Sequence, residues 1–128
     1  MPAPEPHVLV VDDDPLIVRL LELNFRLEGF RVSTERRGDL AVDRAIASAP
    51  DAIVLDVSMP GIDGYEVCRR LRDVPATANV PVVLLTAHAD DHDARADLPG
   101  VVAYMTKPFD PEALVATVRS ALVAEEAS

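Results

Sequence analysis

The sequence has no tryptophan, a single cysteine, and only 12 Lys+Arg residues against 22 Asp+Glu residues. The lone cysteine, Cys68, cannot form an internal disulfide, which favours a reducing compartment such as the cytoplasm. The resulting net charge of −10 repels the phosphate backbone of nucleic acids and the anionic face of a membrane. We therefore expect no direct binding to nucleic acid or to membranes.

Long hydrophobic runs are also missing. The longest clearly apolar stretch, Val80–Leu85, is far shorter than the ~20 residues that span a bilayer. The first seven residues, MPAPEPH, lack the basic start and apolar core of a secretory signal. With 128 residues, the chain is long enough for one domain with a single sizeable core, which we expect to be cytoplasmic.

What the chain does contain is an alternation of short apolar runs with segments of helical period. The runs are rich in Val and Ile and mostly lack apolar–polar alternation, which is typical of parallel strands buried on both faces. They are Val8–Val11, Phe30–Thr34, Ala52–Leu55, Val80–Leu85 and Val101–Met105.

The intervening segments predict helices with recognisable start and stop signals. The first has Asp14 as its N-cap, Pro15 in its first turn and Gly29 after its end. Its expected buried stripe is Leu16, Ile17, Leu20, Leu21 and Leu27. The others are Asp39–Ala49 (Leu40, Ala41, Ala45 and Ile46 inward), Gly64–Asp73 (Val67, Cys68 and Leu71 inward) and Pro111–Ala124 (Leu114, Val118, Ala121 and Leu122 inward, Asp110 as cap).

A further helix, the fourth in chain order, is expected at Asp90–Asp97. This segment is rich in aspartate and has only Leu98 as a large apolar anchor, so we expect a short or mobile helix. Five strands and five helices in alternation predict an α/β fold. Specifically, we expect a doubly wound three-layer sandwich with a five-stranded parallel sheet of order 2-1-3-4-5. The domain would cover residues 7–124, with loose ends at 1–6 and 125–128.

Aspartates follow two of the predicted strands. Asp12 and Asp13 follow the first strand and Asp56 follows the third, and in the order 2-1-3-4-5 these strands are neighbours at the reversal point where such sheets bind ligands. Two carboxylates ~4 Å apart repel by about 4 kcal/mol at an effective dielectric near 20, so they need a counter-charge. An all-oxygen site with few protein ligands suits Mg²⁺. For Asp14 the helix-cap interpretation is preferred, because aspartate is a favoured N-cap residue. For Asp12 and Asp13 the ligand interpretation is preferred, because one cap cannot use three carboxylates.

Two more strand ends complete the set. The fourth predicted strand ends at Thr86 and the fifth is followed by Lys107. Taken singly, Thr86 reads as an ordinary strand-end hydroxyl and Lys107 as a solvated lysine. Beside an acidic cation site, however, a hydroxyl and an ammonium form a cradle for a phosphoryl group with Asp56 as the nucleophile.

These motifs, in this order, resemble the receiver domain of bacterial two-component response regulators, over about residues 7–123. The segments that carry the resemblance are Val8–Pro15 (VLVVDDDP), Val54–Gly64 (VLDVSMPGIDG), Leu84–Ala87 (LLTA) and Tyr104–Phe109 (YMTKPF). Each motif is weak alone, but the ordered set is specific. The resemblance implies a flavodoxin-like fold and a phosphorylation-dependent signalling role.

The resemblance also implies roles for individual residues. Asp56 would accept a phosphoryl group from the phosphohistidine of a sensor kinase or phosphotransfer protein. Mg²⁺ would be held by Asp13, Asp56 and the backbone carbonyl of Ser58, with Asp12 acting through water. Lys107 would pair with the acceptor and then the phosphoryl group, and the bond before Pro108 is usually cis in this family.

The switch and hydrolysis roles also follow from the resemblance. Thr86 would move toward the phosphoryl group and Tyr104 would turn inward with it, although nothing local excludes an ordinary half-buried aromatic at Tyr104. Ser58 and His88 occupy positions that tune hydrolysis of the aspartyl phosphate; a solvated loop histidine is the alternative for His88. The sequence departs from the family between Thr86 and Lys107, which is short and has an unusual helix at Asp90–Asp97.

Other functional classes fit less well. A haloacid-dehalogenase-type enzyme would need a second acid at the position of Ser58 and a cap domain, and a flavin or nucleotide module would not place three aspartates at its phosphate loop. The stronger rival is a receiver-like docking module that binds a partner without phosphorylation. We expect a signalling domain rather than an enzyme, acting on a downstream protein, either as a single-domain regulator or as a piece of a longer chain.

Overall fold

The computed structural model describes residues 5–87 and 99–127. Its centre is one parallel sheet of five strands in the order β2-β1-β3-β4-β5, which confirms the predicted order. All four strand pairs are parallel, and the register shifts once, between Val82 and Val83 in the β4–β5 pair. The strands are β1 His7–Val11, β2 Arg31–Glu35, β3 Ala52–Asp56, β4 Val82–Thr86 and β5 Val101–Thr106.

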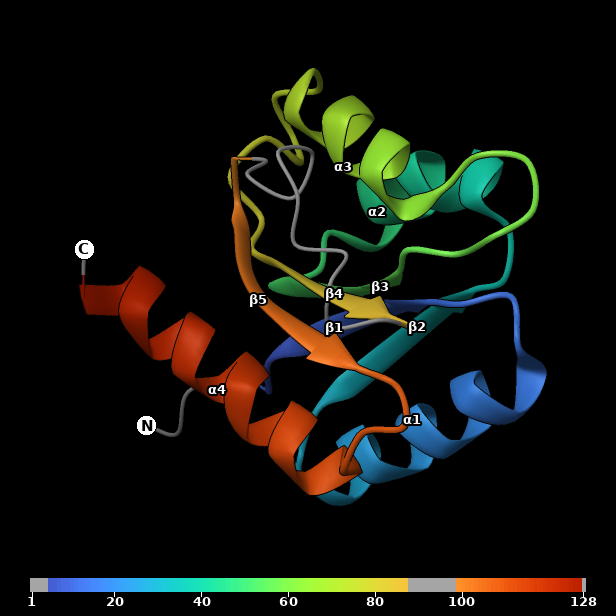
Figure 1. Ribbon diagram of the computed structural model, residues 1–128. Coiled ribbons are helices and arrows are strands. Elements are labelled where there is room, and N and C mark those ends of the chain that lie inside the picture. The colour runs from blue at the N-terminus through green and yellow to red at the C-terminus, as the bar shows by residue number, and fades with distance from the viewer. Residues whose placement is uncertain (1–4, 88–98, 128) are drawn as a thin grey trace.

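Helices cover both faces of this sheet. Figure 1 shows α2 and α3 on one face and α1 and α4 on the other, which gives the three layers expected from the sequence. Their bounds are α1 Pro15–Leu27, α2 Ala41–Ser48, α3 Gly64–Arg72 and α4 Pro111–Ala127, with a short 3₁₀ turn, η1, at Gly38–Leu40. The helix expected at Asp90–Asp97 lies outside the described residues.

Two layers of apolar side chains hold the sandwich together. Alternate residues of β1, Val8 and Val10, contact the α1–α4 layer, whereas Leu9 and Val11 contact the α2–α3 layer. Strands β1, β3 and β4 are buried at every position, because helices lie on both sides. This explains why the strand segments are continuous apolar runs instead of alternating ones.

Helix α1 has the predicted ends but a different buried face. Asp14 caps it by accepting a hydrogen bond from the Leu16 N–H, and Gly29 follows it with φ +90°. The buried residues, however, are Val18, Leu21 and Phe25, whereas Leu16, Leu20 and Leu27 of the predicted stripe are exposed. Phe25 fixes this orientation because its ring packs edge-on against Phe30 at 5.0 Å.

Helix α2 also differs from the prediction. It begins at Ala41 after the η1 turn, and the residues that it buries are Ala41 and Ala45. Leu40 and Ile46, which were expected to point inward, are 39% and 45% exposed. The buried face of α2 is therefore made of small side chains.

The other two helices follow their predicted patterns. In α3, Asp63 is the N-cap and Val67, Cys68 and Leu71 are buried. In α4, Asp110 caps the first turn by accepting from the Glu112 N–H, and the inward residues include Leu114 and Val118. Helix α4 continues to Ala127, beyond the end that the apolar pattern indicated. Within the described residues, no helix combines the length and apolarity needed to cross a membrane.

Candidate phosphoryl-acceptor and metal site

Three carboxylates meet at the carboxyl end of the sheet. Asp56 is the last residue of β3, and Asp12 and Asp13 directly follow β1, its neighbour in the sheet. One oxygen from each of the three lies within 4.8 Å of the others. Asp12 is 0% exposed and Asp56 3% exposed, while Asp13 is half-buried. The parallel topology therefore assembles this cluster from sequence positions that are more than forty residues apart.

Backbone hydrogen bonds fix the orientation of the two buried acids. The Asp12 N–H donates to the Glu35 carbonyl at 3.1 Å, and the Asp12 carboxylate accepts from the Asp14 N–H at 2.9 Å. In the loop after β3, the Ser58 N–H lies 3.4 Å from Asp56 Oδ1. Each acid is thus held by the loop that follows its own strand.

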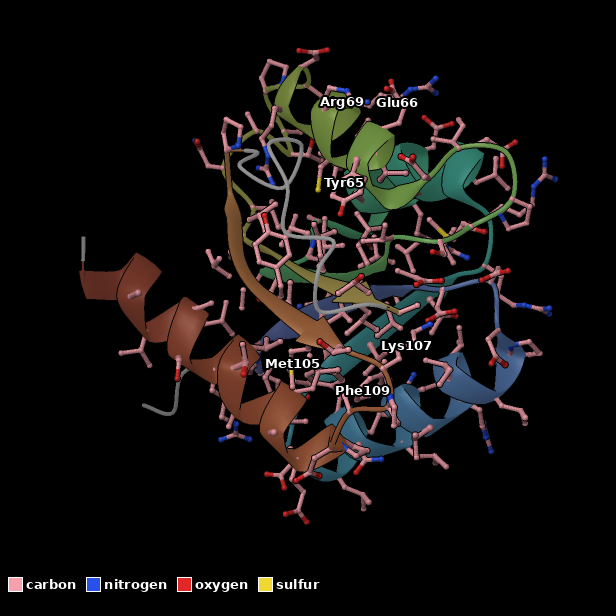
Figure 2. All side chains as sticks on the ribbon, viewed as in Figure 1. Tyr65, Glu66, Arg69, Met105, Lys107 and Phe109 are labelled. Carbon is pink, nitrogen blue, oxygen red and sulfur yellow. The ribbon has the colours of Figure 1, made fainter. Side chains whose placement is uncertain are left out.

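Lys107 supplies the positive charge at this site. It directly follows β5, where its N–H donates to the Thr86 carbonyl at 2.8 Å, and the Lys107–Pro108 peptide bond is cis, as the resemblance implies. The Nζ atom lies 3.0 Å from Asp12 Oδ2 and 3.3 Å from Asp56 Oδ1. Figure 2 shows Lys107 with Phe109 on the turn that leads from β5 to α4.

The electrostatics of the cluster follow from crowding and burial. Burial raises the pKa of Asp56 from 3.8 to about 6, and the Asp12 carboxylate adds to this increase while Lys107 opposes it. Burial lowers the pKa of Lys107, but its hydrogen bond to Asp12 and the charges of both acids outweigh this and raise the pKa overall. Three carboxylates and one ammonium leave two negative charges when all are ionised.

This donor set fits a divalent cation. All candidate ligands are oxygen atoms, and one ion of charge +2 would balance the two surplus negative charges. Asp12, Asp13 and Asp56 are the side chains close enough together to hold such an ion. Mg²⁺ also retains several waters, which matches a site with few protein ligands at the edge of the sheet.

Thr86 and Tyr104 lie on one face of the sheet next to this cluster. Thr86 is the last residue of β4 and is 1% exposed, whereas Tyr104 on β5 is half-buried and packs against the α2–α3 side of the core. Tyr104 pairs in register with Leu84, two residues before Thr86, so both side chains are on the same side of the sheet. Ser58 is exposed, and His88 lies outside the described residues.

One site component that the sequence analysis did not assign is Gly64. Its N–H donates to the Val57 carbonyl at 2.9 Å, and a Cβ there would lie 2.5 Å from the Asp56 carbonyl oxygen. Only glycine therefore lets the first turn of α3 approach Asp56 so closely. The Asp63–Gly64 pair, an N-cap followed by a residue with no side chain, was the available signal.

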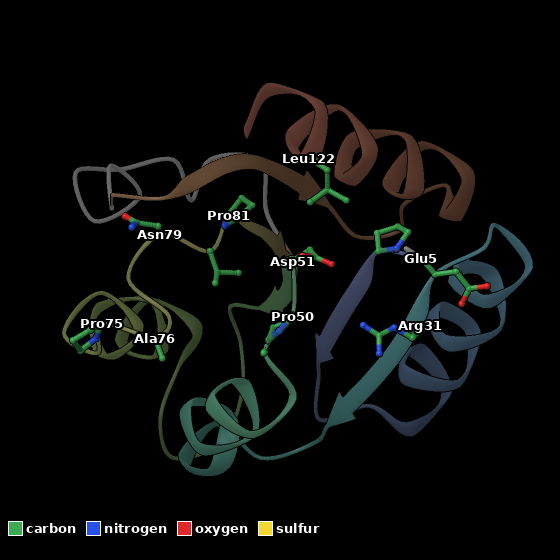
Figure 3. Close-up of a pocket in the computed structure, with 12 residues that line it drawn as sticks. Glu5, Arg31, Pro50, Asp51, Pro75, Ala76, Asn79, Pro81 and Leu122 are labelled. Atoms are coloured by element: carbon green, nitrogen blue, oxygen red, sulfur yellow. The ribbon is translucent and has the colours of Figure 1, made fainter. Parts of the chain in front are cut away.

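A separate hollow of the described surface contains none of the three clustered acids. It has a volume of about 600 Å³ and lies at the amino ends of the strands, at the opposite edge of the sheet from Asp56 (Figure 3). Its lining combines prolines with the mixed charges of Glu5, Arg31 and Asp51. None of the predicted site residues that the structure describes lines it, so those residues are grouped at the carboxyl edge instead.

Comparison with known proteins agrees with this geometry. The family model "Response regulator receiver domain" matches residues 8–119. The response regulator PleD of Caulobacter vibrioides is 46% identical over 115 residues, which are 89% of this chain and 25% of that protein. The phosphate regulon transcriptional regulatory protein PhoB of Rhizobium meliloti is 39% identical over 91% of this chain and 52% of its own length. The chain thus spans about a quarter and about half of these relatives.

Solved structures give the same result. A putative response regulator from Chloroflexus aurantiacus is 36% identical with a TM-score of 0.81, covering 93% of this chain and 98% of that one. The chemotaxis response regulator CheY4 of Vibrio cholerae is 27% identical with a TM-score of 0.84, covering 91% and 98%. Receiver domains are signalling domains of two-component systems and not classical enzymes. Sequence, fold and the acidic cluster at the carboxyl edge agree, and the chain belongs to the response regulator receiver domain family.

Proposed function

We propose that this domain is a Mg²⁺-dependent switch in which Asp56 accepts a phosphoryl group from a protein phosphohistidine. The observation that carries the proposal is the grouping of Asp12, Asp13 and Asp56 within 4.8 Å, with Lys107 Nζ 3.3 Å from Asp56. This is a nucleophilic carboxylate surrounded by the cation-binding and cationic groups that phosphoryl transfer needs.

The transfer would use the residues as follows. A carboxylate oxygen of Asp56 attacks phosphorus, the phosphorus–nitrogen bond of the phosphohistidine breaks, and the imidazole leaves with the bonding electron pair. Asp12, Asp13, Asp56 and the Ser58 carbonyl would hold Mg²⁺, which stabilises negative charge on the transferring oxygens. Lys107 donates to the same group, and Ser58 and His88 are proposed to tune its later hydrolysis by water.

Phosphorylation would then bias a two-state equilibrium. The aspartyl phosphate adds acceptor oxygens next to Thr86, so the Thr86 hydroxyl gains a charged partner only in the phosphorylated state. Tyr104, on the same side of the sheet, would turn inward as Thr86 moves. A change from 1% to 99% of the active state needs ~5.5 kcal/mol, which a few charge-assisted hydrogen bonds can supply.

The surface beside Lys107 supports a protein as the phosphoryl donor. A hollow of about 410 Å³ is lined by Lys107 itself and by four apolar or ring-bearing residues, Ile17, Leu20, Pro108 and Phe109. Exposed leucines continue this surface along α1, with Leu16 78%, Leu20 41% and Leu23 47% exposed. Because this apolar surface adjoins the reacting group, we assign it to the donor, a sensor histidine kinase or phosphotransfer protein.

The output would be contact with a downstream protein in the cytoplasm. The net charge of −10 argues against direct binding to nucleic acid or an anionic membrane. The second candidate function is a docking module that binds its partner without phosphorylation. Its sequence need not retain the acid, threonine and lysine set that is present here.

The test is the intact mass of the protein after incubation with acetyl phosphate. We expect one added phosphoryl group that requires both Mg²⁺ and Asp56, so that the Asp56→Asn variant and a sample with chelator remain unmodified. If no adduct forms although Mg²⁺ binds, and beryllofluoride leaves the NMR spectrum unchanged, the phosphorylation-independent docking module replaces this proposal.

A further inference from the structure

The loop between β3 and α3, residues 57–63, lies directly after the proposed phosphoryl acceptor. It contains Ser58, whose carbonyl is the proposed backbone ligand of the cation. Its first residue is held from both sides: the Val57 N–H donates to the Leu85 carbonyl at 2.9 Å, and the Val57 carbonyl accepts from the Gly64 N–H at 2.9 Å. These two bonds hold the start of the loop against β4 and α3.

Gly38 lies close to this loop from outside it. It is the first residue of η1 and is buried, and Figure 1 shows the loop after β3 passing the start of α2 before it enters α3. A Cβ on Gly38 would lie 2.6 Å from the carbonyl oxygen of Ile62 and 3.4 Å from Met59 Cε. The first distance is too short for a carbon–oxygen contact, and the atom it meets is backbone, which cannot rotate away.

The reason for a glycine at this position is space, because its φ is not in the left-handed region. Gly29 and Gly61 are the opposite case: their φ angles are +90° and +82°, and a Cβ at either would meet nothing within 4 Å. Gly38 therefore sets how closely η1 and the 57–63 loop approach each other.

The distance between η1 and the 57–63 loop affects the metal site, because Mg²⁺ requires near-ideal octahedral geometry with ligands at about 2.0–2.1 Å. A side chain at Gly38 must push Ile62 by several tenths of an ångström, and Ile62 belongs to the loop that carries Ser58. We propose that Gly38 is a positioning residue for the Mg²⁺ site, acting through Ile62 on the loop that supplies the Ser58 carbonyl. The proposal rests on the Mg²⁺ site of the proposed function, but it does not require phosphorylation to occur.

The test compares the Mg²⁺ affinity of Gly38→Ala with that of Gly29→Ala by isothermal titration calorimetry. Calorimetry suits this chain because it has no tryptophan to report binding by fluorescence. Gly29→Ala is the matched control, since it forces alanine into a positive φ at the end of α1, away from the loop. We expect Gly38→Ala to weaken Mg²⁺ binding about 10- to 100-fold, as substitutions that support metal ligands indirectly do, and Gly29→Ala to stay within about threefold of wild type.

A second readout separates positioning from general loss of stability. In the absence of metal, amide chemical shifts of residues 57–63 should move in Gly38→Ala and not in Gly29→Ala, at equal fractions folded. If Gly38→Ala is unfolded in buffer, both measurements are repeated with trimethylamine N-oxide, which favours the folded state without relieving a backbone collision.

Wild-type Mg²⁺ affinity in folded Gly38→Ala overturns the proposal, and so does an equal loss of affinity in Gly29→Ala. Failure of this proposal can also be distinguished from failure of the proposed function. If the wild-type protein binds Mg²⁺ but acetyl phosphate never modifies it, phosphorylation at Asp56 fails while the comparison of Gly38→Ala with Gly29→Ala still stands.

Discussion

The Nζ atom of Lys107 lies 3.0 Å from Asp12, closer than its 3.3 Å separation from Asp56. One ammonium therefore bridges two buried carboxylates, and its nearest partner is not the proposed phosphoryl acceptor. In the metal-free protein the lysine is the main positive charge that offsets two acids that are almost fully buried. We therefore expect removal of the Lys107 ammonium to lower the free energy of unfolding even when no phosphoryl transfer takes place.

We predict that Lys107→Met destabilises the metal-free protein by about 3 kcal/mol, because removing one partner leaves buried charge uncompensated. Saturating Mg²⁺ should recover most of this loss, since the cation supplies the missing charge. The measurement is urea unfolding in chelator and in Mg²⁺. Arg69→Met is the control, because its ion pair with Glu66 is exposed and screened by solvent, so removing it should cost much less than removing Lys107. Equal losses in the two variants would contradict this account of Lys107.

Asp56 should make the metal-free protein less stable as pH rises. Its pKa is raised from 3.8 to about 6 in the folded state, so the folded protein holds the proton more tightly than the unfolded chain does. The slope of unfolding free energy with pH is then negative between about pH 4 and pH 6, and the accumulated loss is about 2–3 kcal/mol. Asp56→Asn removes this loss, so the variant should be the more stable protein at pH 7.5 in chelator.

The measurement is urea unfolding of wild type and Asp56→Asn in chelator from pH 4 to pH 8. The difference between the two curves isolates Asp56, because His7 titrates in both proteins. Burial lowers the pKa of His7, so its contribution has the opposite sign: stability is lost as pH falls. If the free energy of unfolding has the same pH dependence in wild type and in Asp56→Asn, Asp56 is not the titrating group.

The neighbouring carboxylates Asp13 and Asp14 allow a matched comparison, because only Asp13 belongs to the candidate metal site. Asp13 belongs to the carboxylate cluster, whereas exposed Asp14 accepts the capping hydrogen bond from the Leu16 N–H. We predict that Mg²⁺ raises the thermal midpoint of wild type and of Asp14→Asn, because asparagine caps a helix as well as aspartate does. Asp13→Asn should lose most of the rise. A full Mg²⁺ effect in Asp13→Asn would remove this carboxylate from the ligand set.

The sheet and its carboxyl edge were predictable because both depend on local signals. Continuous Val- and Ile-rich runs identify buried parallel strands, and Asp56 and Lys107 follow such runs directly. The buried face of α1 was not predictable, because Leu16, Leu20 and Leu27 are as apolar as the residues that are buried. Phe25 and Leu21 are buried because they pack against residues of the sheet and against Phe30. These contacts exist only in the folded protein, so the sequence of the helix alone does not reveal them. Gly38 was missed for the same reason, since its neighbour Ile62 is distant in sequence.

The exposed leucines of α1 lead to the last prediction, which concerns the phosphoryl donor. Leu20→Glu should leave modification by acetyl phosphate unchanged, because Leu20 lines the hollow beside Lys107 but belongs to neither the acid cluster nor the core. Transfer from a protein donor should slow about 10- to 100-fold, since burying a leucine at an interface is worth about 1.5–3 kcal/mol. The assay is phosphotransfer from each autophosphorylated sensor kinase of the same genome. Val123→Glu on α4, 63% exposed, is the control and should transfer at the wild-type rate. If Leu20→Glu accepts phosphoryl groups from its kinase as fast as Val123→Glu does, the donor binds elsewhere, and the leucines of α1 face a different partner.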